Sequence, residues 1–153
     1  MINIILLNEL QLKNIPSQKK FQLWITTTIE NIFAKIPEQF SEVCISIIDK
    51  ETSAELNASY RKKSGPTNVL SFTYDSMPGI EETSLGDLAI CAEIVETEAK
   101  IQNKKLESHW AHLTVHGFLH LLGYDHIIEN DAAMMESLEI EILKKLGIEN
   151  PYV

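Results

Sequence analysis

The chain contains little arginine and cysteine, and it has no long apolar run. Among its 153 residues Arg61 is the sole arginine, and Cys44 and Cys91 stand in separate segments without C-x-x-C spacing. Such isolated cysteines predict reduced, buried thiols rather than a redox motif. No apolar stretch approaches the roughly 18 residues of a membrane helix, and the first residues lack the basic start of a signal peptide. We therefore expect a cytoplasmic protein without a membrane segment.

The balance of charge is acidic. Twenty-two acidic residues against 13 basic ones give a formal net charge of −9. This balance argues against broad, non-specific adhesion to nucleic acid or to an anionic membrane. A polyanionic ligand would need a local positive patch, and the run Arg61-Lys62-Lys63 is the best candidate. The other lysine pairs are typical of solvated helix surfaces.

The length and the order of patterns predict one α+β domain over residues 1–153. Apolar residues at helical or alternating spacing indicate a mixed sheet of about four strands packed with about five helices. A capping box at Thr52 and a cap at Asp131 mark two helix starts. The expected strands are Met1–Leu7, Glu42–Asp49, Asn68–Tyr74 and Leu85–Ala92, and the expected helices are Ser17–Lys35, Thr52–Lys63, Glu93–Gln102, Glu107–Leu122 and Asp131–Leu146.

Three histidines follow the spacing H-x-x-x-H-x-x-G-x-x-H. His116 and His120 lie four residues apart, so they share one face of a helix. Gly123 can end that helix in a left-handed conformation and let the chain bring His126 back to the same point. Three neutral imidazoles with an open fourth position are typical of a catalytic zinc site. The sequence therefore predicts zinc bound by His116, His120 and His126 on a metzincin-like helix.

The residue after the first of these histidines is Gly117. Zinc peptidases with the H-E-x-x-H motif place a glutamate there, which acts as general base. Gly117 has no side chain, so peptide hydrolysis by the usual route is disfavoured. A glycine inside a helix also costs about 1 kcal/mol against alanine, which indicates a packing or close-approach reason for its presence.

Two further histidines extend the same helical stripe. His109 and His112 precede His116 at spacings that return to one face. His112 and His120 are about 12 Å apart along the axis, so only one of them can share an ion with His116. We favour His120, because only that pair is followed by a glycine and another histidine. For His109 and His112 a hydrogen-bonded or solvent-facing role is favoured over a place in the substrate cleft.

Four blocks in order resemble the YbeY family of bacterial endoribonucleases, also described as rRNA maturation factors. The resemblance covers nearly the full chain. The family often has Asp where this chain has Asn68. The matching blocks are Leu56-Asn57-Ala58-Ser59-Tyr60-Arg61, Gly65-Pro66-Thr67-Asn68-Val69-Leu70-Ser71-Phe72, Leu85-Gly86-Asp87-Leu88 and Thr114-Val115-His116-Gly117-Phe118-Leu119-His120-Leu121-Leu122-Gly123-Tyr124-Asp125-His126.

The resemblance implies a metal-dependent, single-strand-specific endoribonuclease that acts in rRNA 3′-end maturation and ribosome quality control. It implies zinc on His116, His120 and His126, and a functionally important arginine at Arg61. A guanidinium is a natural bidentate phosphate ligand, so Arg61, helped by Lys62 or Lys63, would bind the substrate and stabilise the transition state. The acidic net charge suggests that the small ribosomal subunit or an associated protein delivers the RNA.

Several roles stay open. A water activated by zinc could act without a protein base, or a carboxylate could assist. The aromatic candidates for base stacking are more typical of core packing. A peptide or amide hydrolase, a ribosome assembly factor with little catalysis and a purely structural zinc site are alternatives. The candidate bases are Asp125 (which could instead orient a histidine), Asp87 and Glu136, and the aromatic candidates are Tyr124, Phe72 and Tyr74.

Overall fold

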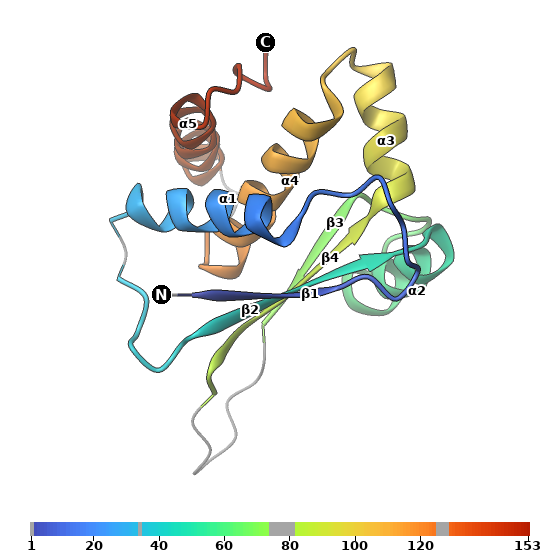
Figure 1. The fold of residues 1–153 in the computed structure, drawn as a ribbon, viewed down its shortest axis with the longest axis horizontal. Coiled ribbons are helices and arrows are strands. Elements are labelled where there is room, and N and C mark those ends of the chain that lie inside the picture. Colours follow the sequence, from blue (N-terminus) through green and yellow to red (C-terminus); the bar gives the residue numbers. More distant parts are fainter. Residues whose placement is uncertain (1, 34, 74–81, 125–128) are drawn as a thin grey trace.

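The computed structural model describes residues 2–33, 35–73, 82–124 and 129–153, which form one four-stranded sheet with helices on both faces (Figure 1). The strand order is β1-β2-β4-β3. β1, β2 and β4 run parallel, whereas β3 runs antiparallel to β4. This mixed sheet confirms the predicted α+β class. The strands are β1 (Asn3–Leu7), β2 (Glu42–Ile48), β3 (Val69–Phe72) and β4 (Ser84–Cys91).

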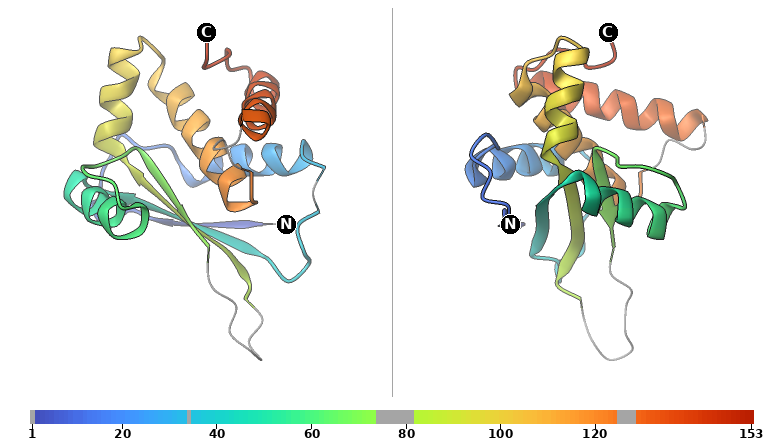
Figure 2. Two further views of the ribbon diagram at one scale, coloured as in Figure 1. Left: turned by 180° about the vertical axis from the view of Figure 1, so that it is seen from behind. Right: turned by 90° about the vertical axis from the view of Figure 1, so that its right-hand side faces the viewer.

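The helices divide unequally between the two faces of the sheet. α1, α4 and α5 lie over one face, and α3 rises beside α4 from the end of β4 (Figures 1 and 2). α2 lies on the opposite side (Figure 2). The five helices match the predicted number. They are α1 (Gln18–Glu30), α2 (Lys50–Arg61), α3 (Ala92–Ile101), α4 (Leu106–Leu121) and α5 (Glu129–Lys145).

Some helix ends differ from the prediction. α1 stops at Glu30 rather than Lys35, and the N–H of Asn31 donates to the carbonyl of Thr28 at 3.1 Å. α2 starts at Lys50, because the carboxylate of Asp49 accepts a hydrogen bond from the N–H of Thr52 at 2.8 Å. The predicted cap at Thr52 is therefore wrong. Aspartate is a stronger N-cap residue than threonine, and it stands at the required spacing. α5 begins before its predicted cap, since Asp131 lies inside the helix.

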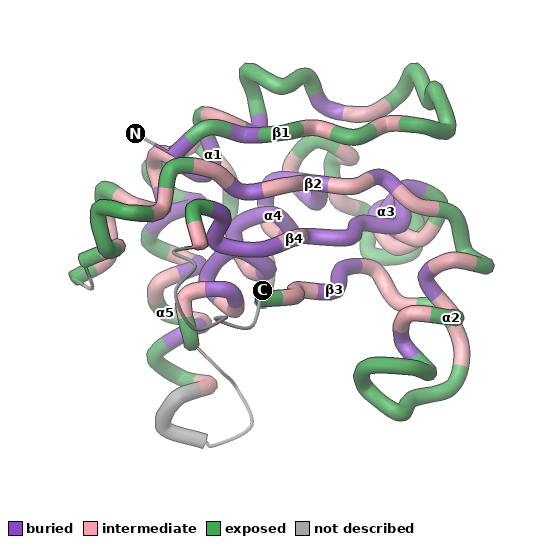
Figure 3. The backbone as a smooth tube through the Cα atoms, turned by 90° about the horizontal axis from the view of Figure 1, so that it is seen from below, coloured by how far each residue is buried: buried purple, intermediate pink, exposed green. Residues whose placement is uncertain are grey.

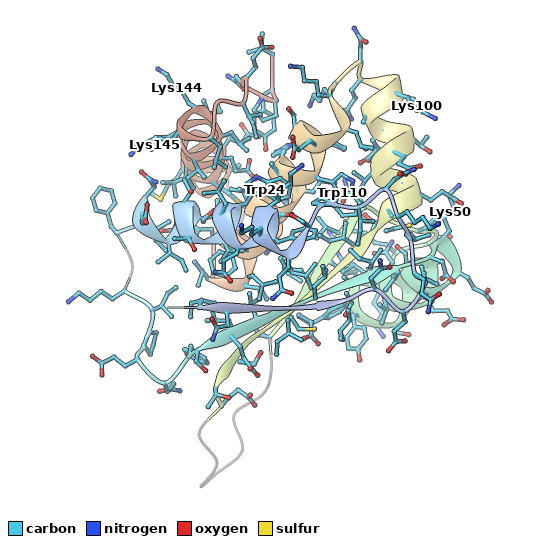
Figure 4. All side chains as sticks on the ribbon, viewed as in Figure 1. Trp24, Lys50, Lys100, Trp110, Lys144 and Lys145 are labelled. Atoms are coloured by element: carbon cyan, nitrogen blue, oxygen red, sulfur yellow. The ribbon has the colours of Figure 1, made fainter. Side chains whose placement is uncertain are left out.

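The core fills the space between the sheet and the larger helix layer. β4 is buried along most of its length, β2 alternates between buried and half-buried residues, and the middle of α4 is buried (Figure 3). The ring of Phe21 makes edge contacts with Trp24 and Trp110, at centroid distances of 5.5 and 6.0 Å. The contact with Trp110 joins α1 to α4, and both tryptophans are buried among the helices on this side of the sheet (Figure 4). The position of α4 is therefore set by core packing rather than by surface contacts.

A β-bulge interrupts β4 where this strand pairs with β2. The β2–β4 pairing shifts between Glu42↔Ser84 and Cys44↔Asp87. Gly86 lies in this shift with φ +138°, and a Cβ atom there would lie 2.1 Å from the carbonyl oxygen of Phe72. Only glycine fits such a close approach of two backbones. The extra residue sets which side chains of β4 face each side of the sheet. Leu88 faces the core, and Asp87 faces the groove on the opposite side.

Cys44 and Cys91 are both free thiols, as expected, but only Cys91 is buried and Cys44 is half-buried. Burial raises the pKa of each thiol, so both are neutral near pH 7. None of the described helices combines the length and the apolar character that a bilayer crossing requires.

Candidate active site

A stripe of three half-buried histidines runs along α4, which is otherwise largely buried. His112, His116 and His120 are spaced four residues apart, and neighbouring ring centroids lie 6.2 and 5.9 Å apart. The helical stripe predicted from the spacing is thus present. His109 continues the row, with its ring centroid 6.2 Å from that of His112, but its side chain is only 3% exposed and its Nε2 lies 3.0 Å from Glu98 on α3. A hydrogen-bonded role was favoured for His109, and the structure confirms it.

The end of α4 has the geometry that the glycine predicted. Gly123 has φ +98°. Its N–H donates to the carbonyl of His120, and the N–H of Tyr124 donates to the carbonyl of Leu119, both at 3.1 Å. This pair of bonds is a Schellman motif, which ends a helix and turns the chain. His126 and Asp125 lie outside the described residues, so their places in the site remain predictions.

A buried glutamate on α5 contacts the histidine stripe. Glu139 is 0% exposed, and its Oε1 accepts a short hydrogen bond from Nδ1 of His116. Its Oε2 accepts another short hydrogen bond from the hydroxyl of Tyr152, and lies 3.7 Å from Nε2 of His112. Glu139 is not among the site residues that the sequence predicts. The sequence pattern could have indicated this residue, because a carboxylate interrupts the apolar face of α5 that Met135, Ile142 and Leu143 form.

The charge state of this cluster follows from its hydrogen bonds. Burial alone would raise the pKa of Glu139, but the imidazole of His112, 3.7 Å away, and the hydrogen bonds donated by His116 and Tyr152 outweigh that effect and lower the pKa to about 2. Burial and the hydrogen bond to Glu139 raise the pKa of Tyr152. Near pH 7 the glutamate is therefore an ionised acceptor, and Tyr152 is a neutral donor. An ionised carboxylate can only accept, so His116 must carry its proton on Nδ1.

This tautomer suits metal binding by the other ring nitrogen. A histidine that donates its Nδ1–H to a carboxylate presents the lone pair of Nε2 to a metal, and the carboxylate fixes the ring orientation. Neutral imidazoles with such support are favourable zinc ligands. The donor chemistry of the stripe therefore suits a metal ion such as zinc, while the ligand set His116, His120 and His126 stays a prediction.

A second grouping of possible ligands overlaps the predicted one. Among the residues that the structure describes, His112, His116 and Glu139 each offer a ligand atom within 4.8 Å of the others. An ion held there would replace the hydrogen bonds that Glu139 now makes with His116 and Tyr152. The structure therefore leaves two overlapping sets, and His116 belongs to both.

Gly117 brings α4 against the sheet. A Cβ atom at this position would lie 3.0 Å from Cγ2 of Val69 and 3.1 Å from Cδ2 of Leu88. The hydroxyl of Ser71 donates to the carbonyl of Gly117 at 2.9 Å. The expected close-approach reason for this glycine is confirmed. A glutamate side chain starting here would head into the sheet, which agrees with the absence of the peptidase motif.

Arg61 lies in a groove on the other face of the sheet. The groove has a volume of about 680 Å³ and is lined by residues of α2, β2, β3 and β4, among them Arg61, Phe72 and Asp87. Ser71 also lines it, and this residue contacts Gly117 beside His116. The edge strand β3 thus lies between the groove and the histidine helix. Arg61 and α4 approach the same edge of the sheet from opposite faces.

The remaining predicted residues divide between the groove and the surroundings. Lys62 adopts the left-handed conformation (φ 57°), and its Nζ donates to the carbonyl of Ser59 at 3.1 Å, at the end of α2. Lys63 is exposed, and the described groove lining includes neither lysine. Tyr124 packs against the core, as favoured. Among the candidate bases, Asp87 lines the groove and Glu136 is half-buried on α5, whereas the aromatic candidate Tyr74 lies outside the described residues.

Comparison with known proteins places these features in a family context. The pattern of the family described as "Endoribonuclease YbeY" matches residues 6–147. A Coxiella burnetii protein of that name (strain RSA 493 / Nine Mile phase I) is 50% identical over 152 residues, which cover 99% of both chains. A Colwellia psychrerythraea protein of the same name is 50% identical over 139 residues, covering 91% of this chain and 89% of its own.

A solved structure supports the fold. The solution structure of a Thermotoga maritima protein matches 96% of this chain and 92% of its own length, with a TM-score of 0.57 at 23% sequence identity. At that identity the likeness concerns the architecture alone.

Proposed function

Because the chain belongs to the endoribonuclease YbeY family, and is accordingly a metal-dependent hydrolase of phosphodiester bonds, we propose that it is a zinc-dependent, single-strand-specific endoribonuclease. We place its action in rRNA 3′-end maturation and ribosome quality control, as the resemblance implies. Residues 1–153 would form one cytoplasmic domain.

One observation carries the metal part of this proposal. Glu139 accepts a hydrogen bond from Nδ1 of His116, which leaves Nε2 as the ring nitrogen with ligand character. We propose that His116, His120 and His126 hold one zinc ion. When bound, the ion supplies a Lewis acid that polarises a phosphoryl oxygen and lowers the pKa of a water. The supporting carboxylate for His116 is that of Glu139.

Arg61 is the proposed phosphate ligand. The guanidinium presents paired N–H donors that match two phosphate oxygens, and it is always charged. It lies in the groove that is lined by β3, and β3 is the strand that contacts the histidine helix on its other face. Arg61 would hold the phosphodiester and offset the charge that develops in the transition state. Lys62 and Lys63, directly after it, would raise the local positive potential without direct contact to the groove.

The net charge of −9 bears on how the RNA arrives. A single arginine with two neighbouring lysines is a small positive patch, and the rest of the molecule repels a polyanion. We therefore propose that the substrate is presented by the small ribosomal subunit or a protein bound to it. Free single-stranded RNA would then bind weakly and with strong dependence on salt.

The test uses the protein purified with its metal. Cleavage of unstructured and duplex RNA is measured together with zinc content for wild type, Arg61→Ala, Lys144→Ala and His116→Ala. We expect Arg61→Ala to lose cleavage but retain zinc, and His116→Ala to lose both. Lys144→Ala, which removes a distant surface charge, should match wild type. Full cleavage by zinc-free protein would overturn the metal role.

Two assays separate the alternatives. Hydrolysis of casein or a small amide would favour a peptide or amide hydrolase, which the sheet contact at Gly117 disfavours. Binding to the small ribosomal subunit without any RNA cleavage, in zinc-loaded protein, would favour an assembly factor with little catalysis.

A further inference from the structure

Two aromatic rings meet in the groove beside Arg61. The ring of Tyr60, in the last turn of α2, contacts the ring of Phe72 at the end of β3, with centroids 4.8 Å apart and an interplanar angle of 64°. Both residues line the same groove as Arg61. An aromatic surface and the guanidinium of the adjacent residue are therefore presented to one open space.

Tyr60 is unusually exposed for an aromatic residue. It is 67% exposed, whereas Phe72 is half-buried beneath it. Leaving apolar ring surface in water costs free energy that burial would recover. An exposed ring held by edge contact with a second ring is thus a preformed surface, ready to be covered by a flat ligand.

The composition of the groove indicates which ligand. Ile48, Leu56 and Leu70 lie beside the aromatic pair, and Arg61 is the one basic residue in the described lining. The other described lining residues are small or polar, with Asp87 as the one acid among them. A site that bound only an RNA backbone would present several cations along its length. One cation beside an aromatic surface matches a single nucleotide, with an anionic phosphate at one end and a flat base at the other.

We propose that Tyr60 and Phe72 form a stacking site for one unpaired nucleobase of single-stranded RNA, while Arg61 binds the adjacent phosphate. The proposal rests on the proposed role of Arg61 in substrate binding. It gives a physical basis for single-strand specificity, because the faces of a base within a duplex are covered by its stacked neighbours. Sequence preference at this position would be weak, since every base has a face that can stack.

A purely structural role for Tyr60 makes a different prediction. If the ring only covers Phe72, then leucine, which is apolar and of similar reach, should replace it with little effect on substrate binding. If the ring stacks on a base, phenylalanine and tryptophan should replace tyrosine, and leucine should not.

The experiment compares Tyr60→Phe, Tyr60→Trp and Tyr60→Leu as zinc-loaded proteins cleaving a single-stranded RNA oligonucleotide. We expect the first two to keep the wild-type KM within about threefold, and Tyr60→Leu to raise it roughly 5- to 100-fold, from the usual stacking contribution. kcat should change less than KM. Phe33→Ala, which removes a 99% exposed ring elsewhere, is the matched control and should match wild type.

A second arm moves a single abasic site along the same oligonucleotide. At one position the missing base should raise KM for wild type about as much as Tyr60→Leu does with intact RNA. The same abasic substrate should have no added effect on Tyr60→Leu, because both changes remove one contact. An unchanged KM in Tyr60→Leu, or an abasic effect that adds fully to it, would overturn the stacking site.

The two proposals fail in distinguishable ways. If the zinc-loaded wild-type protein does not cleave RNA, or Arg61→Ala cleaves as well as wild type, the proposed function is wrong. If Arg61→Ala is inactive while Tyr60→Leu binds and cleaves like wild type, only the stacking site is wrong. Thermal unfolding of each variant shows whether a loss of binding reflects a loss of fold.

Discussion

At the scale of single residues, Glu139 determines which nitrogen of His116 faces the rest of the site. The carboxylate is ionised, because its pKa lies near 2, and it can only accept hydrogen bonds. His116 must therefore donate through Nδ1. Tyr152 supplies a second donor, from the segment that follows α5. A buried charge is stable only when it is paired in this way. Glu139 and Tyr152 act through His116, so both are positioning residues.

Zinc affinity tests this positioning role. Glu139→Gln removes the charge that fixes the His116 tautomer, and we expect zinc affinity to fall about 10- to 100-fold, the usual effect of losing an outer-sphere partner. Tyr152→Phe leaves the carboxylate in place and should have a smaller effect of the same sign. Competition with a chelator measures both. Glu141→Gln, an exposed glutamate on the same helix, is the control. Unchanged affinity in Glu139→Gln would contradict the role.

The two overlapping ligand sets can be separated by alanine variants of the flanking histidines. If zinc uses His116, His120 and His126, then His120→Ala removes a ligand and should weaken binding by more than the 10- to 100-fold typical of outer-sphere partners. His112→Ala should retain the ion. Zinc content and chelator competition distinguish the two. The opposite result would place the ion among His112, His116 and Glu139, whose ligand atoms also converge.

The residues of the candidate site were only partly predictable. The spacing of His112, His116 and His120 fixed their common helix face, because helical geometry is local. Arg61 was conspicuous as the sole arginine. Glu139 and Tyr60 were missed for different reasons. Glu139 reaches His116 across a helix–helix contact that no local pattern encodes, and the groove beside Tyr60 forms only when α2 packs near β3.

At the scale of elements, glycines set how closely neighbouring segments approach. Gly117 lets α4 contact Val69 and Leu88 of the sheet. Gly86 lets the bulge of β4 approach the backbone of β3. The sequence indicated a reason for Gly117, since glycine is costly inside a helix. The bulge at Gly86 could not be predicted, because it depends on the register between β2 and β4, which only the assembled sheet defines.

Gly86→Ala should destabilise the protein strongly. The new Cβ would meet the carbonyl oxygen of Phe72 at 2.1 Å, and the backbone would be held at φ +138°. Overpacking and conformational strain together should lower the free energy of unfolding by roughly 3 kcal/mol or more. Gly65→Ala is the control, because Gly65 also has positive φ but no atom within 4 Å of its Cβ position. Urea denaturation should show a clearly smaller loss for Gly65→Ala, and equal losses would contradict the steric account.

At the scale of the whole molecule, two helices on opposite faces of the sheet both contact its edge strand β3. α4 lies over one face and α2 borders the other (Figure 2). β3 separates them, with Ser71 contacting Gly117 and Phe72 contacting Tyr60. The class and the number of elements followed from the sequence. The strand order β1-β2-β4-β3 did not, because hydrophobic patterns show which face of a strand is buried but not which strand pairs with it.

A partly buried network holds this edge to the helix layer and should make stability depend on pH. Nε2 of His109 lies 3.0 Å from Glu98, which also accepts a hydrogen bond from Asn68, just before β3, at 3.1 Å. Burial lowers the pKa of His109, although Glu98 partly opposes the shift. The unfolded chain therefore binds this proton more readily than the folded protein does. The stabilising contribution is fully present above about pH 6.5, the ordinary histidine pKa, and is lost as pH falls through and below it.

We expect the free energy of unfolding of metal-free protein, measured in urea, to decline on acidification across this range. His109→Gln should flatten that decline, since it removes the proton-binding group but keeps a side chain that can contact Glu98. His112→Gln removes a histidine without touching Glu98 and serves as the control. A slope in His109→Gln as steep as in wild type would show that other groups control the pH dependence. The hydrogen bonds at His109 would then join α3, α4 and the start of β3 without coupling their stability to pH.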